Sequence, residues 1–371
     1  MVLMALDHTR DYFHAPAFFY DPADPLQTSI PIYATRWITH FCAPVFSFLA
    51  GISVFFVSLK RTRTELSGFL VKRGLWLIFI ELTIVTFAWY FNISFNTVGL
   101  LVIWALGISM LVLAGLVHLP KGIVLMISCL IIVGHNLLDN VHFSGNLLWA
   151  ILHEPAMFGS SDGAKFYVDY PLLPWIAVMS LGYCFGSLYH SSFNPNSRKM
   201  ILNYLGIAFI VLFLAIRGIN IYGDPQPWTQ FEVFTQTVMS FMNPAKYPPS
   251  LSYLLMTLGP ALLFLANAES FKGKVVNFFQ TFGRVPFFYY ILHLYLIHLL
   301  ALLAAELTGY GWEKMILNDW VTYLPSLQGY GFGLWLVYLV WFVVIGLLYP
   351  LCKKFDNYKI SHKEKWYLGY L

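Results

Sequence analysis

The chain has 371 residues, of which 58% are hydrophobic and only 11% are charged, and its formal net charge is +4. Soluble domains carry about 25% charged residues, so this composition excludes an ordinary water-soluble protein. The small net charge gives no sign of nucleic acid as a partner. Continuous apolar runs of about 20 residues recur, and each is long enough to cross about 30 Å of hydrocarbon as a helix. We therefore predict an all-α, polytopic transmembrane helical bundle.

About ten spans are expected, and the first is expected to be truncated, because Met1 to His14 is too short to cross a bilayer alone. The sequence shows no internal repeat, so a single integral-membrane domain over 1–371 is sufficient. The predicted helices cover residues 1–13, 39–59, 74–91, 97–118, 121–138, 171–190, 200–218, 250–268, 285–305 and 331–352.

The distribution of positive charge predicts the orientation of these helices. Lysine and arginine concentrate in one set of alternate loops and in the C-terminal tail, and such residues accumulate on the cytoplasmic side. The C-terminus is therefore expected inside, with His8 and His14 toward the outer face. The long outer connections are either solvated loops or the place where a polar ligand is handled. They cover residues 15–37, 139–169, 219–249 and 306–330.

An unusual group of ionisable residues opens the chain. Asp7, Arg10 and Asp11 are spaced three and four apart, so they share one face of a helix. They could form a self-neutralising cluster at the membrane boundary. A cluster of this kind in a membrane protein also marks a functional site by default. His8 lies three positions from Asp11, and a histidine oriented by a carboxylate is a common general base. His14 follows where the helix should end, before Pro16.

Further polar residues lie in later spans. Arg36 and His40 are four apart, and Arg36 is either an anchor for an anionic or carbonyl group or an ordinary interfacial residue. His293 and His298 are five apart, so they spread around a helix by roughly 140°. That spacing suits helix-to-helix hydrogen bonds better than shared metal ligation. The four cysteines also lack metal-type spacing, and no metal is expected.

Two proline-rich stretches at span entrances are predicted to line a pore. One runs over 169–179 and contains Trp175, and the other runs over 243–251 and contains Lys246. Lys246 would hold a phosphate or carboxylate, or it would simply extend toward the membrane surface. The sequence contains no phosphate-binding loop, Gly-rich dinucleotide turn, Gly-x-Ser-x-Gly elbow or His-Glu-x-x-His motif.

Taken together, several of these segments resemble a known family. The chain is similar over nearly its whole length to bacterial membrane proteins related to heparan-α-glucosaminide N-acetyltransferase, within the transmembrane acyltransferase superfamily. The segments that carry the resemblance are Leu3 to Phe13, Arg36 to Pro44, Phe46 to Gly51, Lys246 to Leu251 and Gly283 to His298.

The resemblance implies acyl transfer across a membrane by a single acyltransferase-like domain. Acetyl-CoA or another acyl-CoA would bind from the cytoplasmic side of a bacterial inner (plasma) membrane. The acyl group would reach an amine or hydroxyl of an extracytoplasmic sugar, glycan or glycolipid. No metal is implied, and a second copy of the chain is considered as a homodimer partner.

The same resemblance assigns candidate site residues. The family's essential histidine falls best on His14, across a gap, while His8 replaces a preceding asparagine, so the two histidines compete for the role of base. Replacing His14 by alanine should then abolish transfer. The catalytic candidates are His14, His8 and Asp11. The substrate-binding candidates are Asp7, Arg10, Arg36, His40 and His298, and the acyl-CoA-binding or pore candidates are Lys246, Arg284, His293 and Trp175.

Two alternatives stay open at this stage. One is a proton-coupled transporter or flippase for a polar or lipid-linked solute, in which the ionisable groups relay protons. Such a protein would need no acyl-CoA, and a labelled solute should cross proteoliposomes. The other is a non-catalytic membrane scaffold, which leaves the cluster around His8 without a purpose.

Overall fold

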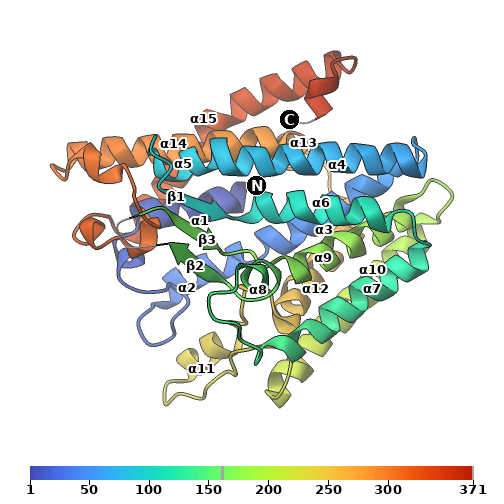
Figure 1. The fold of residues 1–371 in the computed structure, drawn as a ribbon, viewed down its shortest axis with the longest axis horizontal. Coiled ribbons are helices and arrows are strands. Elements are labelled where there is room, and N and C mark those ends of the chain that lie inside the picture. Colours follow the sequence, from blue (N-terminus) through green and yellow to red (C-terminus); the bar gives the residue numbers. More distant parts are fainter. Residues whose placement is uncertain (160–162, 370–371) are drawn as a thin grey trace. The chain divides into compact units, whose positions relative to one another are not determined.

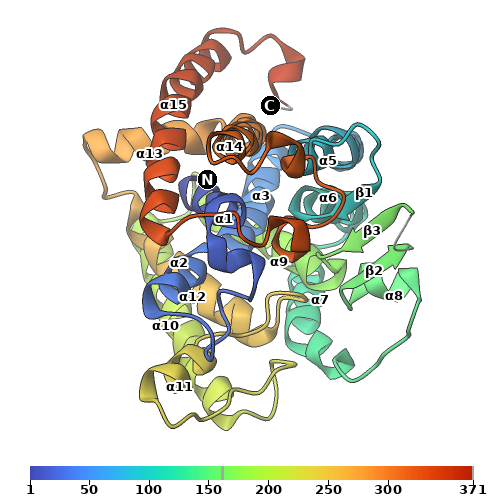
Figure 2. The ribbon, with the colours of Figure 1, turned by 90° about the vertical axis from the view of Figure 1, so that its left-hand side faces the viewer.

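The computed structural model describes residues 1–159 and 163–369, and Figures 1 and 2 show it as a ribbon. Helices account for 69% of the structure and strands for 4%, which confirms the predicted all-α class. The chain divides into two compact units, each built from segments that are distant in sequence. The units are described separately below.

The first unit comprises Met1–Cys42, Thr83–Thr97 and Phe271–Leu371. Helix α1 packs against three other helices of the unit, α2, α14 and α15. Its start is held by the Trp341 Nε1–H, which donates to the Val2 carbonyl over 2.8 Å. The helices are α1 (Val2–Phe13), α2 (Ile30–Thr39), α5 (Thr86–Tyr90), α13 (Lys274–Arg284), α14 (Pro286–Leu307) and α15 (Leu334–Ser361). Short 3-10 turns include η1 (Ala15–Phe18) and η5 (Trp312–Met315).

The second unit comprises Ala43–Leu82 and Val98–Ser270. Figure 1 shows α4 and α6 side by side, and α10 packs along α12. Small residues permit both contacts: a Cβ on Gly74 would lie 2.7 Å from the Gly107 carbonyl, and one on Gly206 would lie 2.9 Å from the Gly259 carbonyl. The helices are α3 (Cys42–Ser58), α4 (Arg63–Ile80), α6 (Val102–Leu116), α7 (Lys121–Gly134), α8 (Leu147–Leu152), α9 (Leu172–Phe185), α10 (Pro195–Ile219), α11 (Phe234–Phe241) and α12 (Leu251–Ala268).

A small sheet was not predicted from the sequence. Its three strands, β1 (Thr97–Leu100), β2 (Ala156–Gly159) and β3 (Lys165–Val168), lie in the order β1-β3-β2. Strands β2 and β3 form an antiparallel hairpin beside α8 (Figure 2), with Ala156 opposite Val168. The intervening residues 160–162, which belong to the predicted outer connection 139–169, lie outside the described part of the chain. The expected helix 97–118 therefore begins later, at Val102.

The positions of the predicted spans along the chain agree with the helices better than their lengths do. Each of the ten expected spans has a helical counterpart in the described residues. Seven helices there are long and apolar enough to cross a membrane, so the chain is an integral membrane protein. The seven are Ile30–Ser58, Lys121–Leu138, Leu172–Tyr189, Pro195–Ile219, Leu251–Ala268, Pro286–Leu307 and Leu334–Ser361.

The largest difference from the predicted boundaries is the helix expected at 74–91. Helix α4 already begins at Arg63, because Thr62 and Glu65 form a capping box. The backbone N–H of Thr62 donates to Glu65 Oε2 over 2.8 Å. The helix then passes through a π-helical turn, Glu81–Val85, into α5. Glu81, at the start of this turn, accepts the Trp104 backbone N–H over 2.9 Å.

Candidate functional site

Asp7 is the centre of the polar cluster in the first unit. Three side chains donate to its carboxylate: Arg10 Nη2 at 2.6 Å, Thr39 Oγ1 at 2.9 Å and Arg36 Nη1 at 3.2 Å. Thr39 and Arg36 come from α2 and Asp7 and Arg10 from α1, so the cluster joins these two helices. Ion pairs that are held this closely away from bulk water are geometrically well defined. The cluster therefore connects α1 to α2 through charged side chains.

Arg10 is the buried cation of this cluster, with a side chain only 3% exposed. Its Nη2 atom contacts both Asp7 and, at 2.9 Å, Asp11. The helical spacing predicted this shared face. Nε and Nη1 of Arg10 are buried and make no hydrogen bond within the described residues. With Arg36, two cations face two carboxylates, so the cluster is balanced in charge.

His8 belongs to a second set of contacts, formed with α14. Its Nδ1 lies 2.8 Å from Nε2 of His293, and Nδ1 of His293 lies 3.0 Å from the Tyr289 carbonyl. A carbonyl only accepts, so His293 carries its proton on Nδ1 and accepts at Nε2. His8 must then donate from Nδ1, which places its lone pair on Nε2. The contacts thus assign one tautomer to each ring, and in that tautomer Nε2 of His8 can accept a proton.

Aromatic rings surround this pair of histidines. The Trp89 ring meets His8 edge-on with centroids 4.8 Å apart, and the Tyr289 ring stacks on His293 at 5.1 Å. Such rings exclude water. In a medium of lower dielectric constant, the hydrogen bonds of the chain from His8 through His293 to the Tyr289 carbonyl, here called the relay, are stronger. His8 is nevertheless partly exposed, whereas His293 is completely buried. Of these two rings, His8 is therefore the one that has exposed surface.

His14 occupies the position just after α1, where the sequence predicts that the helix ends. Its backbone is extended and pairs with Phe332, because Ala15 N–H donates to the Phe332 carbonyl over 3.1 Å. The ring is 2% exposed and its Nδ1 makes no hydrogen bond to a described residue. Burial, assisted by the positive charge of Arg10, lowers the pKa of His14 to about 4. His14 is therefore neutral at pH 7.

Asp11, His40 and His298 have other partners than the sequence suggested. Asp11, expected to orient His8, pairs with Arg10, while His8 contacts His293. His40 caps α2, with Nδ1 3.1 Å from the Arg36 carbonyl. His298 has Nδ1 2.9 Å from the Ala88 carbonyl and Nε2 2.8 Å from the Met315 carbonyl. His40 and His298 thus make hydrogen bonds to the backbone. Their substrate-binding roles stay predictions.

The predicted acyl-CoA or pore residues are divided between the units. His293 is in the relay, and Arg284 is 57% exposed and pairs with Asp356 at 3.4 Å, both in the first unit. Trp175 and Lys246 belong to the second unit. Trp175 is 1% exposed, so it is a core residue there.

Lys246 has a titratable neighbour in the second unit. Its ammonium lies 4.9 Å from the centroid of the Tyr247 ring, and it also acts on the carboxyl of Asp169. Burial raises the pKa of Asp169 to about 6, and the charge of Lys246 opposes that rise. Lys246 thus has a local partner of opposite charge, and its role in binding acyl-CoA stays a prediction.

Sequence reasoning missed some members of these clusters. Thr39 donates to Asp7, and its spacing of three from Arg36 on one helix was the available signal. Trp89 carried no signal, because only tertiary packing brings it to His8. A separate cluster of His135, Asp139 and His153 in the second unit was also missed. There the signal was the spacing of four between His135 and Asp139 near the end of one predicted span.

Comparison with known proteins identifies the family of this chain. The family model described as heparan-alpha-glucosaminide N-acetyltransferase, catalytic, matches residues 2–227 of the 371. The matched segment contains the Asp7 cluster with His8 and His14, and it ends before His293. Neither the curated proteins nor the solved structures include a match. Since more than half of its length fits, the chain belongs to the heparan-alpha-glucosaminide N-acetyltransferase catalytic family.

Proposed function

We propose that this membrane acetyltransferase-family protein moves an acetyl or other acyl group from cytoplasmic acyl-CoA to an amine or hydroxyl of an extracytoplasmic sugar or glycan. The observation that carries the proposal is the hydrogen bond between His8 and His293, which assigns to His8 a tautomer whose Nε2 can accept a proton. His8 lies within the segment that matches the acetyltransferase family. Acyl transfer needs a base of this kind, because the hydroxyl or amine that attacks the thioester must lose a proton.

The proposed step balances with the residues present. The acceptor oxygen or nitrogen attacks the thioester carbon while Nε2 of His8 takes its proton. The new carbon–oxygen or carbon–nitrogen bond forms, the carbon–sulfur bond breaks, and the proton passes to the leaving thiolate to give free CoA. His293 holds the His8 ring in the required tautomer, so it is a positioning residue.

Arg36 is the cation of the Asp7 cluster that we assign to the substrate. Its side chain is 15% exposed, compared with 3% for Arg10. Arg36 would hydrogen-bond a substrate carbonyl or hydroxyl, and a donor at that place stabilises negative charge that develops on the carbonyl oxygen. Asp7, Asp11 and Arg10 would keep Arg36 in position through their ion pairs.

His14 remains the competing base, because the family resemblance assigns it that role. Its ring is buried and its pKa is about 4, whereas His8 is partly exposed. A base should have a pKa near the working pH, so the low pKa of His14 favours His8. The two histidines can be separated by substitution and by pH.

The remaining assignments extend the proposal to the membrane. The C-terminus would lie in the cytoplasm of a bacterial cell and the His8 end of the relay toward the outer face. The exposed Arg284 of the first unit would bind a phosphate of acyl-CoA, and Lys246, which lies in a connection predicted to be on the outer side, would line a pore. All of 1–371 would act as one domain, alone or as a homodimer.

The experiment uses purified full-length protein in detergent with radiolabelled acetyl-CoA, and it measures binding and slow thioester hydrolysis without an acceptor. His8→Ala and His14→Ala are compared with His118→Ala, which removes an exposed histidine. We expect hydrolysis in wild type and His118→Ala and its loss in His8→Ala. Loss in His14→Ala alone would transfer the role of base to His14. If folded protein does not bind acetyl-CoA but carries solute across proteoliposomes, the acyltransferase proposal is wrong.

A further inference from the structure

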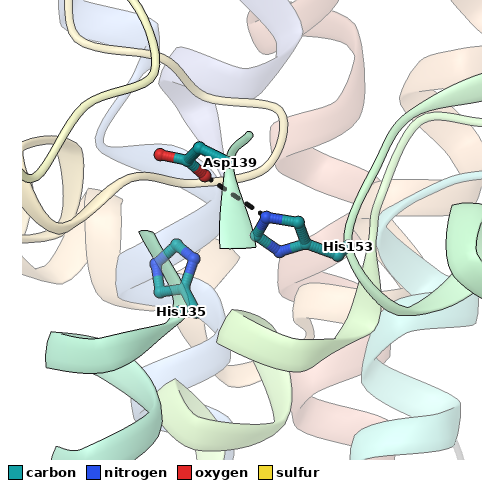
Figure 3. Close-up of side chains that lie close together, drawn as sticks. All are labelled: His135, Asp139 and His153. Atoms are coloured by element: carbon teal, nitrogen blue, oxygen red, sulfur yellow. Dashed lines mark ion pairs between the residues drawn. The ribbon is translucent and has the colours of Figure 1, made fainter. Parts of the chain in front are cut away.

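The second unit contains a cluster of metal-ligating side chains that the acyl-transfer chemistry does not use. His135 lies directly after α7, in η3 (His135–Leu138), Asp139 follows that turn, and His153 ends α8. Figure 3 shows the three side chains converging on one small space. One ligand atom from each lies within 4.8 Å of the others. Residues from two separate helical segments thus meet at one point.

The polar atoms of this cluster are poorly satisfied by the protein. His135 is 2% and His153 3% exposed, and none of their four ring nitrogens makes a hydrogen bond of normal geometry to a described residue. Nε2 of His153 lies 3.2 Å from Oδ1 of Asp139, which is the ion pair drawn in Figure 3. Buried polar groups are nearly always paired. Two buried imidazoles in this condition indicate a ligand that accepts their lone pairs.

The surrounding residues hold the carboxylate in an orientation that suits such a ligand. Asn136 Nδ2 donates to Oδ2 of Asp139 over 2.8 Å, which leaves Oδ1 on the side of the histidines. Asn136 Oδ1 in turn accepts the backbone N–H of Leu251 over 2.9 Å, at the start of α12. The Pro249 carbonyl approaches the His135 ring. Amide and carbonyl groups commonly orient metal ligands in this way.

We propose that His135, Asp139 and His153 bind a divalent transition-metal ion, with Zn²⁺ as the expected occupant. Two imidazole nitrogens and one carboxylate oxygen form a common three-ligand set for zinc, with bonds of about 2.0–2.2 Å and a fourth position for water or another donor. Tetrahedral bonds of that length separate two ligand atoms by about 3.3–3.5 Å. The 3.2 Å between His153 and Asp139 already fits, and His135 would move inward to complete the set.

Chemical class and position together suggest what the ion would do. A carboxylate and two neutral imidazoles leave one net positive charge on a bound Zn²⁺. The ion would thus replace the buried negative charge of the Asp139 carboxylate. The ion would fix the connection between α7 and α8 to the start of α12, through Asp139 and Asn136. The site is therefore assigned a structural role that goes beyond the proposed transfer step. It also departs from the expectation of no metal, which considered the cysteines and the histidines of α14 only.

The test measures metal in the purified full-length protein after dialysis against a weak chelator. Mass-spectrometric metal analysis should find about one Zn²⁺ per chain in wild type and less than about a tenth of that in His135→Ala, Asp139→Asn and His153→Ala. His142→Ala is the matched control, because His142 lies in the same connection and pairs with Glu154 at 2.9 Å but is 62% exposed. Its metal content should equal that of wild type.

Two further measurements keep the test decisive. If an alanine variant does not purify as a single species, the near-isosteric Asp139→Asn and a Co²⁺ titration of the metal-free protein replace it. Bound Co²⁺ in this site should give the visible absorption bands of a four-coordinate ion in wild type and His142→Ala, and not in Asp139→Asn. Wild type without metal, or equal metal in wild type and Asp139→Asn, would overturn the proposal. Neither readout depends on acyl transfer, so this result is independent of the proposed function.

Discussion

Among the described residues, each unit contains a cluster with buried histidines, and the two clusters differ in how their hydrogen bonds are satisfied. In the first unit, Asp7 accepts from three side chains and His293 joins His8 to the Tyr289 carbonyl. In the second unit, His135 and His153 are both buried but make no hydrogen bond of normal geometry to a described residue. Among the described residues, buried histidines therefore have hydrogen-bond partners of normal geometry in the first cluster and lack them in the second.

The difference indicates different chemistry. A histidine whose neighbours assign its tautomer can move a proton in a defined direction without a further ligand. A pair of buried histidines whose nitrogens lack hydrogen bonds of normal geometry is costly unless something binds those nitrogens. We therefore assign proton transfer to the His8 cluster and metal binding to the His135 cluster.

The largest expected effect is on transfer itself. His8→Ala removes the proposed base, and loss of a positioned base typically lowers a rate by about 10²–10⁴-fold. His293→Gln keeps His8 but disturbs its tautomer, so its effect should be smaller. The rate of acetyl transfer from labelled acetyl-CoA measures both variants, with thermal unfolding as a check on the fold. A His8→Ala protein of normal rate would place the base elsewhere.

The next effect is on stability. Asp7→Asn removes the carboxylate that pairs with both Arg36 and Arg10, and the Arg10 side chain is 3% exposed. Removing one partner of a buried ion pair costs about 3–5 kcal/mol. Asp11→Asn is the matched control, because Arg10 then keeps its 2.6 Å contact with Asp7, and it should cost clearly less. Unfolding midpoints in detergent measure both variants. If the midpoint of Asp7→Asn equals that of wild type, the cluster does not stabilise the fold.

Features that lie within a single helix could be predicted from the sequence. Contacts between residues that are far apart in the chain could not. The apolar runs predicted the spans, and the spacing of Asp7, Arg10 and Asp11 predicted their shared face, because both depend on a single helix. The Thr62–Glu65 capping box was visible in the sequence and would have corrected the start of α4.

Pairs that form only through tertiary packing could not be predicted in this way. His8 meets His293 across 285 residues, and His153 meets Asp139 through the connection that contains α8. Single-sequence patterns report the period of an element and the chemistry of its neighbours along the chain. They do not report which faces of two helices pack together.

A third prediction uses the acidity of His14. Burial lowers its pKa in the folded protein to about 4, against about 6.5 unfolded. Between these values the unfolded chain binds more protons, so this residue makes the free energy of unfolding fall as the pH falls from about 6.5 toward 4. At pH 5 the loss is about 2 kcal/mol. His14→Gln should lose less stability between pH 7 and pH 5 than wild type does.

The same residue predicts where the transfer rate would depend on pH. If His14 were the base, the rate would stay constant down to about pH 5 and fall near pH 4, because only there does the ring become protonated. A fall in rate well above pH 5 that persists in His14→Gln would exclude His14 as its source. The pH profiles of wild type and His14→Gln therefore decide between the two histidines.

The smallest expected effect comes from an exposed pair in the second unit that resembles the buried one. His142 Nδ1 lies 2.9 Å from Glu154 Oε1, which is shorter than the 3.2 Å between His153 and Asp139. If distance determined the contribution, His142→Ala would be the more damaging change. The His142 and Glu154 side chains are 62% and 40% exposed, however, and exposed ion pairs contribute only about 0–1 kcal/mol. His142→Ala should therefore shift the unfolding midpoint less than His153→Ala does, and an equal shift would mean that burial is not what distinguishes the two pairs.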